Sequence, residues 1–350
     1  MEIQAYPLPK HFNSAHAFDS GYEPDLQALF PMAIEWKKKL SIPDSGTKGH
    51  PKIHFLGIDL QKSFCFPDGS LYVGGRSGKG AMEDNVRIAE FIYRYLGVIS
   101  DITLTLDTHF AYQIFFPAFW LDQNNHHPNP MTEVTVEEVR TGKYRPNPAI
   151  ASWVCSSDYT WLQQYVEHYC SELEKTGKYK LMLWPYHCLL GSKGHTLAGV
   201  ILEAHYFHSF VKGQQNWCEM KGSNPLTENY SVLRPEVVLS HDAKSIGSKN
   251  TGLIQKLLAS DAVIIGGQAA SHCVASTIDD LLTEILDRDP NLVKKVYILE
   301  DCMSAVTVPN PQGGFYVDFT PQAEAFLKKF KSAGMHVVKS TEPLENWLNI

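Results

Sequence analysis

The thiol of Cys273 is the side chain whose sequence context most clearly suggests chemistry. It ends the segment Gly266–Cys273, Gly-Gly-Gln-Ala-Ala-Ser-His-Cys, which follows an apolar run and leads into a helical pattern. A thiol at a helix start meets the positive end of the helix dipole and free N–H groups, and both favour the nucleophilic thiolate. The same N–H groups can bind the oxyanion of a tetrahedral intermediate. Taken alone, the segment favours a buried structural cysteine over a nucleophile.

A carboxylate that could exchange a proton with such a thiol is Asp59, directly after the apolar run 53–58. In an amide hydrolase this group would take the thiol proton and later return it to the leaving amine. An aspartate that caps a turn is the common structural alternative. The residue type alone does not separate the two interpretations.

Asp107 and His109 form an Asp-x-His pair, and alternate residues of an extended chain point to the same side. A histidine with a carboxylate suits zinc, iron or manganese. His187, in the segment 184–188 (Trp-Pro-Tyr-His-Cys), is available as a further ligand. An isolated Asp-x-His pair is usually accidental, so a metal site depends on these segments meeting in space.

Alternating strand and helix patterns supply a scaffold for these side chains. Apolar runs such as 53–58, 102–106 and 262–266 end close to polar residues, and helical patterns such as 273–286 follow them. The alternation predicts parallel strands with helices on both faces. Because parallel crossovers are right-handed, the carboxyl ends of the strands share one edge, where ligands bind. Further strands are predicted at 180–183, 216–220, 295–299 and 335–338, and further helices at 86–96, 197–211 and 320–332.

We therefore predict an α/β fold, a three-layer αβα sandwich in which a six-stranded, mainly parallel sheet lies between helices. Two segments lie outside the pattern: residues 1–50, an N-terminal extension with little strand character, and residues 110–180, rich in aromatic residues, Asn, His and Pro. We interpret the second segment as a long insertion over the functional edge, because long loops in compact domains are commonly lids or binding loops. The expectation is a single domain over residues 1–350.

In this order, the motifs resemble the nicotinamidase branch of the isochorismatase-like cysteine hydrolases. That branch has an opening strand followed by Asp, Gln, Phe and Gly-Ser-Leu, an Asp-x-His pair, Trp-Pro-x-His-Cys, a nucleophile motif ending in Cys, and an Asp after a late strand. The resemblance covers residues 53–338 apart from the 110–180 region, and it implies the isochorismatase-like hydrolase fold. The matching positions are Asp59, Gln61, Phe64, Gly69–Leu71, Asp107, His109, Trp184–Cys188, His272–Cys273 and Asp301.

The resemblance also implies a catalytic lysine between the aspartate and the cysteine. Lys212 and Lys221 both precede a glycine. We choose Lys221, because it follows a predicted strand and precedes Tyr-Ser at residues 230–231, whereas a cation at a helix end, such as Lys212, is favourable for dipole reasons alone. By resemblance, Lys221 stabilises the thiolate and the carboxylate. The structural alternative for Lys221 is a solvated loop charge.

By the same resemblance, the protein hydrolyses nicotinamide or a similar small aromatic carboxamide to the acid and ammonia through a thioester at Cys273. The N–H groups of Ala269 and Cys273 would hold the oxyanion, with a cis peptide bond before Ala269. Phe64 and Trp184 would flank a flat ring. A divalent metal, zinc, iron or manganese, would bind the ring nitrogen and waters rather than generate the nucleophile. Its protein ligands would be Asp107, His109 and His187.

One departure from the family pattern concerns the metal. Nicotinamidases usually carry another histidine a few residues after Asp-x-His, and residues 110–116 contain none. His126 or His127 in the insertion could complete the site or lie on the surface, and both alternatives stay open. The missing histidine and the aromatic insertion favour, as an alternative function, a related amidase or ureide hydrolase acting on a different or larger substrate. A catalytically silent binding protein is the alternative from another class, and the presence of all three catalytic candidates argues against it.

The composition excludes several other classes of protein. The 350 residues are 44% hydrophobic and 20% charged, which is ordinary globular usage. A net charge of −7 argues against nucleic-acid binding. Seven cysteines without a Cys-x-x-Cys pair argue against a disulfide framework, and we find no signal peptide and no apolar run that would cross a membrane. We expect a reduced, soluble, cytoplasmic protein whose partner is a small-molecule amide, and a homo-oligomer stays open.

Overall fold

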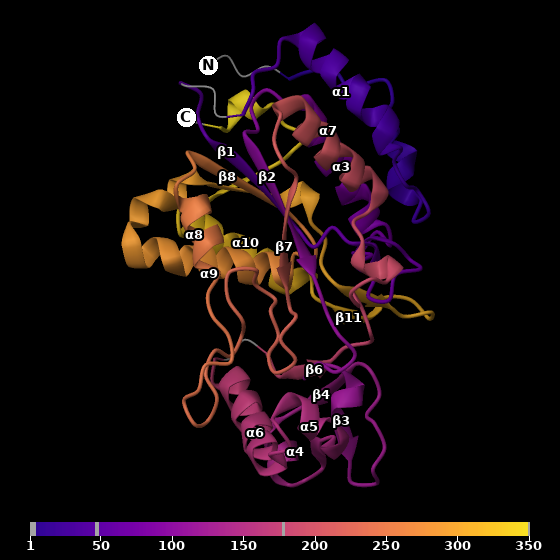
Figure 1. The fold of residues 1–350 in the computed structure, drawn as a ribbon, viewed down its shortest axis with the longest axis vertical. Coiled ribbons are helices and arrows are strands. Elements are labelled where there is room, and N and C mark those ends of the chain that lie inside the picture. The colour runs from indigo at the N-terminus through magenta and orange to yellow at the C-terminus, as the bar shows by residue number, and fades with distance from the viewer. Residues whose placement is uncertain (1–4, 46–48, 177–178, 349–350) are drawn as a thin grey trace.

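The computed structural model describes residues 5–45, 49–176 and 179–348, with a six-stranded sheet at the centre (Figure 1). Strands and helices alternate along the chain as the apolar runs predict. The central strands are buried along their whole length, as a sheet covered by helices on both faces requires. The six strands are β1 (Ile53–Ile58), β2 (Asp101–Asp107), β7 (Trp217–Lys221), β8 (Ala262–Gly267), β9 (Val296–Leu299) and β12 (His336–Val338).

The order across the sheet is β12-β9-β8-β1-β2-β7, and every neighbouring pair is parallel. The predicted α/β sandwich with a six-stranded sheet is therefore confirmed. One predicted strand lies elsewhere: β6 (Leu181–Leu183) pairs antiparallel with β4 (Thr132–Val134), outside the main sheet. A short apolar run does not specify its pairing partner, so the periodicity could not predict this placement.

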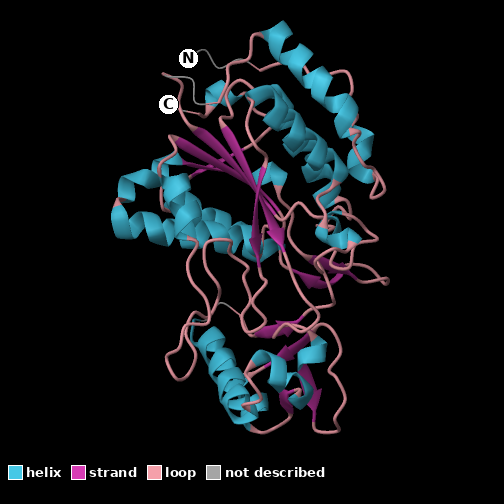
Figure 2. Cartoon of the chain, in the orientation of Figure 1, coloured by secondary structure: helices cyan, strands magenta, loops and turns pink. Residues whose placement is uncertain are grey.

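Helices cover both faces of the sheet, and each face has its own hydrophobic core (Figure 2). One core lies between β1 and the helices at residues 80–94 and 199–212, and the other surrounds the helix that follows β8. The first layer consists of α3 (Gly80–Arg94) and α7 (Gly199–Lys212), with α1 (Leu26–Leu40) outside them, and the second of α8 (Thr251–Leu258), α9 (Cys273–Arg288) and α10 (Thr320–Ser332).

Helix α9 shows how amphipathic spacing fixes a functional residue. Its apolar residues Val274, Ile278 and Ile285 are buried, while Thr283 is exposed. Because the apolar face packs on the sheet, the first residue of the helix, Cys273, is held at the edge where the strands end.

The described part of the N-terminal extension, residues 5–45, contributes a helix to the outside of the molecule. Asp25 caps α1, and its side chain accepts hydrogen bonds from the N–H groups of Gln27 and Ala28. Leu29 and Ala33 are buried where α1 packs against α7. The absence of strands in this part of the extension agrees with the expectation from the sequence.

The insertion folds into a small lobe at the bottom of Figure 1, with a hydrophobic core of its own. Phe119, Tyr165 and Leu183 belong to this core, and Leu226 and Val237 join it from the segment after β7. The lobe therefore draws on residues beyond the predicted limits of the insertion. Its elements are β3 (Trp120–Asp122), β4, α4 (Val136–Arg140), β5 (Tyr144–Pro146), α5 (Ala151–Val154), α6 (Tyr159–Thr176) and β6.

Short elements complete the fold. Helix α2 (Lys62–Cys65) follows β1, and β10 (Thr307–Pro309) and β11 (Phe315–Asp318) form an antiparallel pair. All seven cysteines are free thiols. Within the described ranges, every helix is too short or too polar to cross a membrane. The 3-10 helices span Ser14–Phe18, Pro117–Phe119, Pro148–Ile150, Lys193–His195, Pro290–Lys295, Glu300–Cys302 and Leu344–Asn346.

Candidate active site

The carboxyl edge of the sheet brings Asp59, Lys221 and Cys273 together from three distant parts of the chain. Asp59 directly follows β1, Lys221 is the last residue of β7, and Cys273 is the first residue of α9. Lys221 Nζ lies 2.9 Å from Asp59 Oδ2 and 3.6 Å from Cys273 Sγ. The exposed fractions of the three residues are 0%, 5% and 7%, respectively. A carboxylate, an ammonium group and a thiol are thus in direct contact, away from bulk water.

The backbone and a neighbouring threonine fix the Asp59 carboxylate. Its φ of 46° lies in the left-handed region, which aspartate adopts more readily than most residues. The hydroxyl of Thr105 on β2 donates to Asp59 Oδ1 and accepts from the Asp59 N–H at 2.9 Å. Oδ2 is left to face Lys221. Sequence reasoning missed Thr105, because a threonine within a buried strand carries no signal of its partner.

Burial and mutual contact set the charge states of these groups. Burial raises the pKa of Asp59, and the Lys221 charge partly offsets this effect. Burial also raises the pKa of Cys273 well above its usual value, again with Lys221 opposing. For Lys221, burial lowers the pKa, but the charges of Asp107 and Asp59 outweigh burial and hold it well above its usual value. Burial therefore opposes the thiolate that the helix start and Lys221 favour.

The turn from β8 into α9 holds two N–H groups without a protein acceptor. Gly267 has a φ of 129°, and a Cβ there would lie 2.1 Å from the carbonyl oxygen of Ile58, so only glycine fits. The peptide bond between Gln268 and Ala269 is cis, as the resemblance implies. Within the described ranges, the N–H groups of Ala269 and Cys273 donate to no protein oxygen. Both are available to an oxyanion that forms next to the thiol.

Asp107, His109 and His187 form a compact, buried cluster of metal-ligand types beside these groups. His109 Nε2 lies 2.9 Å and His187 Nε2 lies 3.7 Å from Asp107 Oδ2. Burial raises the pKa of Asp107, but His109 and Lys221 outweigh burial and hold it well below its usual value. In the described part of the chain, no other three His, Cys, Asp or Glu side chains bring their ligand atoms as close, all within 4.8 Å of one another.

The hydrogen bonds of the two imidazoles show that the cluster fits a cation. His109 Nδ1 lies 3.0 Å from the carbonyl oxygen of Gly222, and His187 Nδ1 lies 2.8 Å from that of Pro185. A carbonyl oxygen only accepts, so both Nδ1 atoms carry a hydrogen, and a neutral ring then turns the lone pair of Nε2 toward Asp107. Lone pairs that face a carboxylate oxygen need a cation between them, either a proton or a metal ion. The two Nε2 atoms and the carboxylate oxygen therefore suit a divalent metal.

Gln61 and Gly222 hold this cluster in place. The Gln61 side chain accepts from the Asp107 N–H at 2.7 Å and donates to the Asp107 carbonyl oxygen at 2.8 Å. Gly222 has a φ of 81°, and a Cβ there would lie 2.6 Å from His109 Cε1 and 2.8 Å from Asp107 Oδ1. The Lys-Gly pair thus has a physical reason: the lysine reaches the thiol, and the glycine leaves room for the metal ligands.

The further metal ligands considered in the insertion do not reach the cluster. The His126 side chain is 78% exposed, and the His126 N–H donates to Asp122 Oδ1 at 2.8 Å. His127 Nδ1 lies 2.7 Å from the carbonyl oxygen of Trp120. Both histidines are held within the lobe by these local contacts, so among the residues that the structure describes the cluster offers three candidate ligands.

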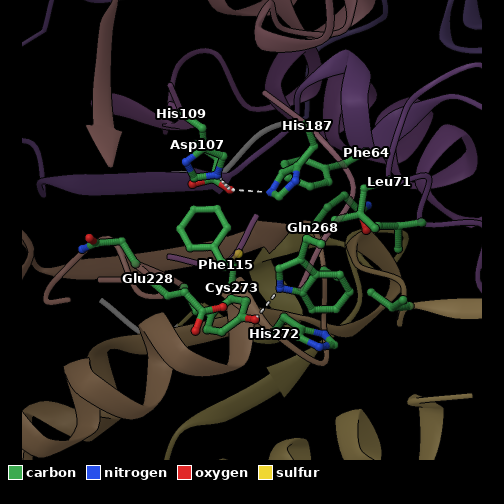
Figure 3. Close-up of a pocket in the computed structure, with 16 residues that line it drawn as sticks. Phe64, Leu71, Asp107, His109, Phe115, His187, Glu228, Gln268, His272 and Cys273 are labelled. Carbon is green, nitrogen blue, oxygen red and sulfur yellow. Dashed lines mark hydrogen bonds and ion pairs between the residues drawn. The ribbon is translucent and has the colours of Figure 1, made fainter. Parts of the chain in front are cut away.

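A pocket opens in front of Cys273, with about 530 Å³ of empty volume including its mouth (Figure 3). Phe64 on α2 and Trp184 from the lobe, the two residues expected to flank a ring, both line it, and Phe115 adds a third aromatic face. Figure 3 shows Asp107, His109 and His187 together in the upper part of the view, with Cys273 and His272 below them. The pocket can therefore hold a flat group between the metal cluster and the thiol.

Five polar residues of the pocket received no role from the sequence: Glu228, Asn229, Tyr230, Gln268 and His272. The indole N–H of Trp184 donates to the Tyr230 hydroxyl at 2.8 Å, and the hydroxyl of Tyr169 donates to Glu228 Oε2 at 3.0 Å. Burial raises the pKa of Glu228 to about 8 and lowers that of His272 to about 4. The motif position of Tyr230 was a usable signal, whereas an acidic residue in a polar segment, such as Glu228, suggests a solvated charge.

Two residues singled out in the sequence lie away from the pocket. Lys212, the alternative lysine, ends α7 and lines a separate cavity at the opposite edge of the sheet, where β1 and β2 begin. The carboxylate of Asp301 accepts hydrogen bonds from the N–H of Ser340 at 2.8 Å and from its hydroxyl at 3.0 Å. Asp301 therefore anchors the C-terminal segment.

No family model matches the chain, and no curated protein matches it. Among solved structures, it is similar to a nicotinamidase/pyrazinamidase of Acinetobacter baumanii, with 18% identity and a TM-score of 0.49 over 84% of this chain and 99% of that chain. It is also similar to the yeast nicotinamidase Pnc1p, with 18% identity and a TM-score of 0.49 over 82% and 99% of the two chains. The pyrazinamidase of Pyrococcus horikoshii in complex with zinc matches with 16% identity and a TM-score of 0.43 over 83% and 99%. The fold described above rests on the strand order and pairing of the chain itself.

Proposed function

We propose that this protein is a hydrolase of linear amides, a nicotinamidase-like cysteine hydrolase that converts nicotinamide or a similar small aromatic carboxamide to the acid and ammonia through a thioester. The observation that carries the proposal is the contact of Lys221 with both Asp59 and Cys273, because the Cys273 thiol lines the pocket. The resemblance of the sequence motifs to nicotinamidases supports the substrate class.

The first half of the proposed reaction forms the thioester. Asp59 accepts the thiol proton as the sulfur of Cys273 attacks the amide carbon. The oxyanion binds the N–H groups of Ala269 and Cys273. Asp59 then gives the proton to the amide nitrogen, the C–N bond breaks, and ammonia leaves. A raised pKa suits Asp59 to this work, because it must hold the proton for part of the cycle.

The second half hydrolyses the thioester. Asp59 takes a proton from a water molecule as the water oxygen attacks the acyl carbon. The same N–H groups hold the second oxyanion, the C–S bond breaks, and the acid leaves. The proton on Asp59 returns to the sulfur, which restores the thiol. A single carboxyl group therefore serves as base and acid in both halves.

Lys221 stabilises the thiolate that exists while Asp59 holds the proton. Its Nζ also lies 3.1 Å from Asp107 Oδ1 and donates to the carbonyl oxygen of Asn229 at 2.8 Å. Because the two carboxylates keep it charged, we assign Lys221 the role of a fixed cation rather than a base.

Asp107, His109 and His187 are the residues that would hold a divalent metal, for which zinc, iron and manganese are the candidates. When bound, the metal would supply a Lewis acid that orients a ring nitrogen and waters at one end of the pocket. Phe64 and Trp184 would hold the ring between them, which aims the carboxamide at the thiol.

Ammonia release from nicotinamide and a panel of other carboxamides tests the proposal. We expect the wild type to hydrolyse at least one aromatic carboxamide, and Cys273→Ala to lower kcat by about 10³-fold or more. Cys170→Ala is the matched control, because Cys170 is a buried thiol in the lobe core. A lack of turnover for every amide, or turnover that survives Cys273→Ala, would overturn the proposal.

A related amidase or ureide hydrolase with a larger substrate is the second candidate. The observation that favours it is the share of the pocket that comes from the lobe and the segment after β7, namely Phe115, Trp184, Glu228 and Tyr230. Competition experiments between nicotinamide and bulkier amides or ureides separate the two candidates. A higher kcat/KM for a bulkier compound would favour the second.

A further inference from the structure

A buried hydrogen-bond network holds the peptide that carries one of the two oxyanion donors. Gln268 precedes Ala269 and has no exposed surface. Its Nε2 donates to Asp84 Oδ2 at 2.9 Å, and its Oε1 accepts from the N–H of Ser304 at 3.3 Å. Its own N–H donates to the carbonyl oxygen of Ile58 at 2.8 Å. Three hydrogen bonds therefore fix the residue just before the donor.

The residue after Ala269 is fixed by the same segment. The N–H of Ala270 donates to the carbonyl oxygen of Ser304 at 2.8 Å. Ser304 thus binds the chain on both sides of Ala269, once through its N–H and once through its carbonyl oxygen. The network restrains the neighbours of Ala269 and leaves its own N–H open.

Asp84 anchors this network to α3. It is 2% exposed, and its Oδ1 accepts from Arg87 Nη2 at 2.8 Å, so both carboxylate oxygens have a donor. Arg87 also donates from Nε to the carbonyl oxygen of Asp301. Asp84 does not line the pocket, so it acts on the reaction through its hydrogen-bond partners Gln268 and Ser304.

We propose that Asp84 and the side chain of Gln268 are positioning residues that aim the Ala269 N–H at the oxyanion, an inference that rests on the proposed function of the site. A single oxyanion donor contributes about 10²- to 10³-fold to kcat. A displacement of about 1 Å can cost about 100-fold, so a donor on a turn gains from a rigid support.

Two variants remove the support in different ways. Gln268→Met keeps the length of the side chain and loses both of its hydrogen bonds. Asp84→Asn keeps the shape but offers one acceptor oxygen to three donors, Gln268, Arg87 and the Ser304 side chain. We expect kcat to fall about 10- to 100-fold in each variant, while KM changes less than about threefold. The double variant should lose no more than the worse single variant, because both act through the same N–H.

The affinity for an aldehyde inhibitor distinguishes a positioning role of Asp84 and Gln268 from a merely structural role. Pyridine-3-carbaldehyde forms a hemithioacetal with Cys273, whose oxygen occupies the oxyanion position, whereas nicotinic acid only fills the pocket. We expect the affinity for the aldehyde to fall in parallel with kcat, and the affinity for the acid to change less than about twofold. NMR of the aldehyde labelled with ¹³C at its carbonyl carbon reports the adduct without any turnover.

Glu203→Gln is the matched control. Glu203 is a 3% exposed carboxylate on α7 that accepts from the Tyr93 hydroxyl at 2.8 Å, and it does not line the pocket. We expect this variant to lower the unfolding temperature without changing the affinity for the aldehyde. If Gln268→Met does not fold, Asp84→Asn still tests the positioning role, because asparagine has the same shape as aspartate.

The aldehyde also distinguishes failure of this inference from failure of the proposed function. Folded Gln268→Met and Asp84→Asn with wild-type affinity for the aldehyde, or with equal losses for aldehyde and acid, would overturn the positioning role. A wild type that forms the adduct but hydrolyses no amide would reject the proposed function, and the two variants would still decide the positioning role. A wild type that forms no adduct would reject both.

Discussion

The floor of the pocket is built by the sheet, and its wall is built by the lobe and the segment after β7. By the floor we mean Cys273, which lines the pocket, together with Asp59 and Lys221, which lie directly behind the thiol; each is placed by a strand end or a helix start. These three groups contact one another, and burial raises the pKa of both the carboxyl group and the thiol. Regular secondary structure thus fixes the groups that would break bonds.

The wall consists of Trp184, Glu228 and Tyr230, all outside the strands and helices. Hydrogen bonds rather than backbone regularity hold it, from Trp184 to Tyr230 and from Tyr169 to Glu228. The comparison teaches that the two parts are held by different means, strand ends for the floor and side-chain hydrogen bonds for the wall, although Lys221 joins them through the carbonyl oxygen of Asn229. We therefore expect changes in the floor to alter kcat and changes in the wall to alter KM.

The largest effect should come from the floor. Asp59→Asn removes a carboxyl group that contacts both Lys221 and the thiol, and we expect kcat to fall by about 10³-fold in the ammonia-release assay. Asp261→Asn is the control, because Asp261 accepts from the Lys52 N–H at 2.8 Å at the opposite edge of the sheet. An Asp59→Asn enzyme within tenfold of wild type would break the assignment of the floor to chemistry.

The next largest effect should come from Gly222, which lies between the floor and the metal cluster. In Gly222→Ala, the new methyl group would collide with His109 and Asp107, and we expect metal affinity to fall about 10- to 100-fold. Metal analysis after dialysis against a graded chelator measures this loss. Gly252→Ala is the control, because the nearest atom to its new Cβ would be 3.8 Å away. Equal metal retention in both variants would show that the cluster does not bind the metal.

A smaller effect should come from the wall. Tyr230→Phe removes the acceptor for the Trp184 indole, and we expect KM to rise about three- to tenfold while kcat stays within about twofold. Steady-state kinetics measure both constants. Tyr95→Phe serves as the control, because that hydroxyl accepts from the Leu344 N–H at 3.1 Å, away from the pocket. A fall in kcat with an unchanged KM would contradict the separation of floor and wall.

Replacing a buried histidine of the helical layer should have the smallest effect on catalysis, and it should instead change how the stability depends on pH. Burial lowers the pKa of His205 to about 4, with the Asp101 charge opposing, whereas the unfolded chain has a value near 6.5. Below pH 6.5 the unfolded chain binds a proton that the folded chain does not. The free energy of unfolding therefore falls as the pH drops from about 6.5 to about 4.

Urea unfolding at pH 7 and pH 5 measures this dependence. His205→Gln should lose less stability than wild type between the two pH values, with kcat/KM at pH 7 unchanged. His126→Gln, at an exposed position, should lose as much as wild type. A pH dependence that His205→Gln does not reduce would show that other groups dominate acid unfolding.

The residues of the floor could largely be predicted from the sequence, because each lies where a strand pattern ends or a helix pattern begins. Asp59 follows an apolar run, Cys273 starts an amphipathic helix, and the alternation of patterns places both at one edge of the sheet. The partners of these residues were not accessible, because contacts such as Thr105 with Asp59 depend on strand order. The raised pKa of Cys273 could not be predicted for a similar reason: the helix start is a local feature, whereas burial depends on the tertiary fold.

The wall could not be predicted from the sequence in the same way. Its contacts join residues far apart in a lobe of short elements, such as Tyr169 with Glu228. Short apolar runs there do not specify pairing, so β6 was expected in the wrong sheet. The aromatic composition of residues 110–180 indicated a binding role in general terms only.

The most direct test of the central claim is to trap the acyl group on sulfur. Wild-type protein is mixed with nicotinamide or the best amide of the panel, quenched in acid during turnover, digested, and analysed by mass spectrometry. We expect the acyl mass on the peptide that contains Cys273 and on no other cysteine peptide, and no adduct in Cys273→Ala. Ammonia release without any acyl-cysteine, or an acyl group on a different residue, would contradict the claim.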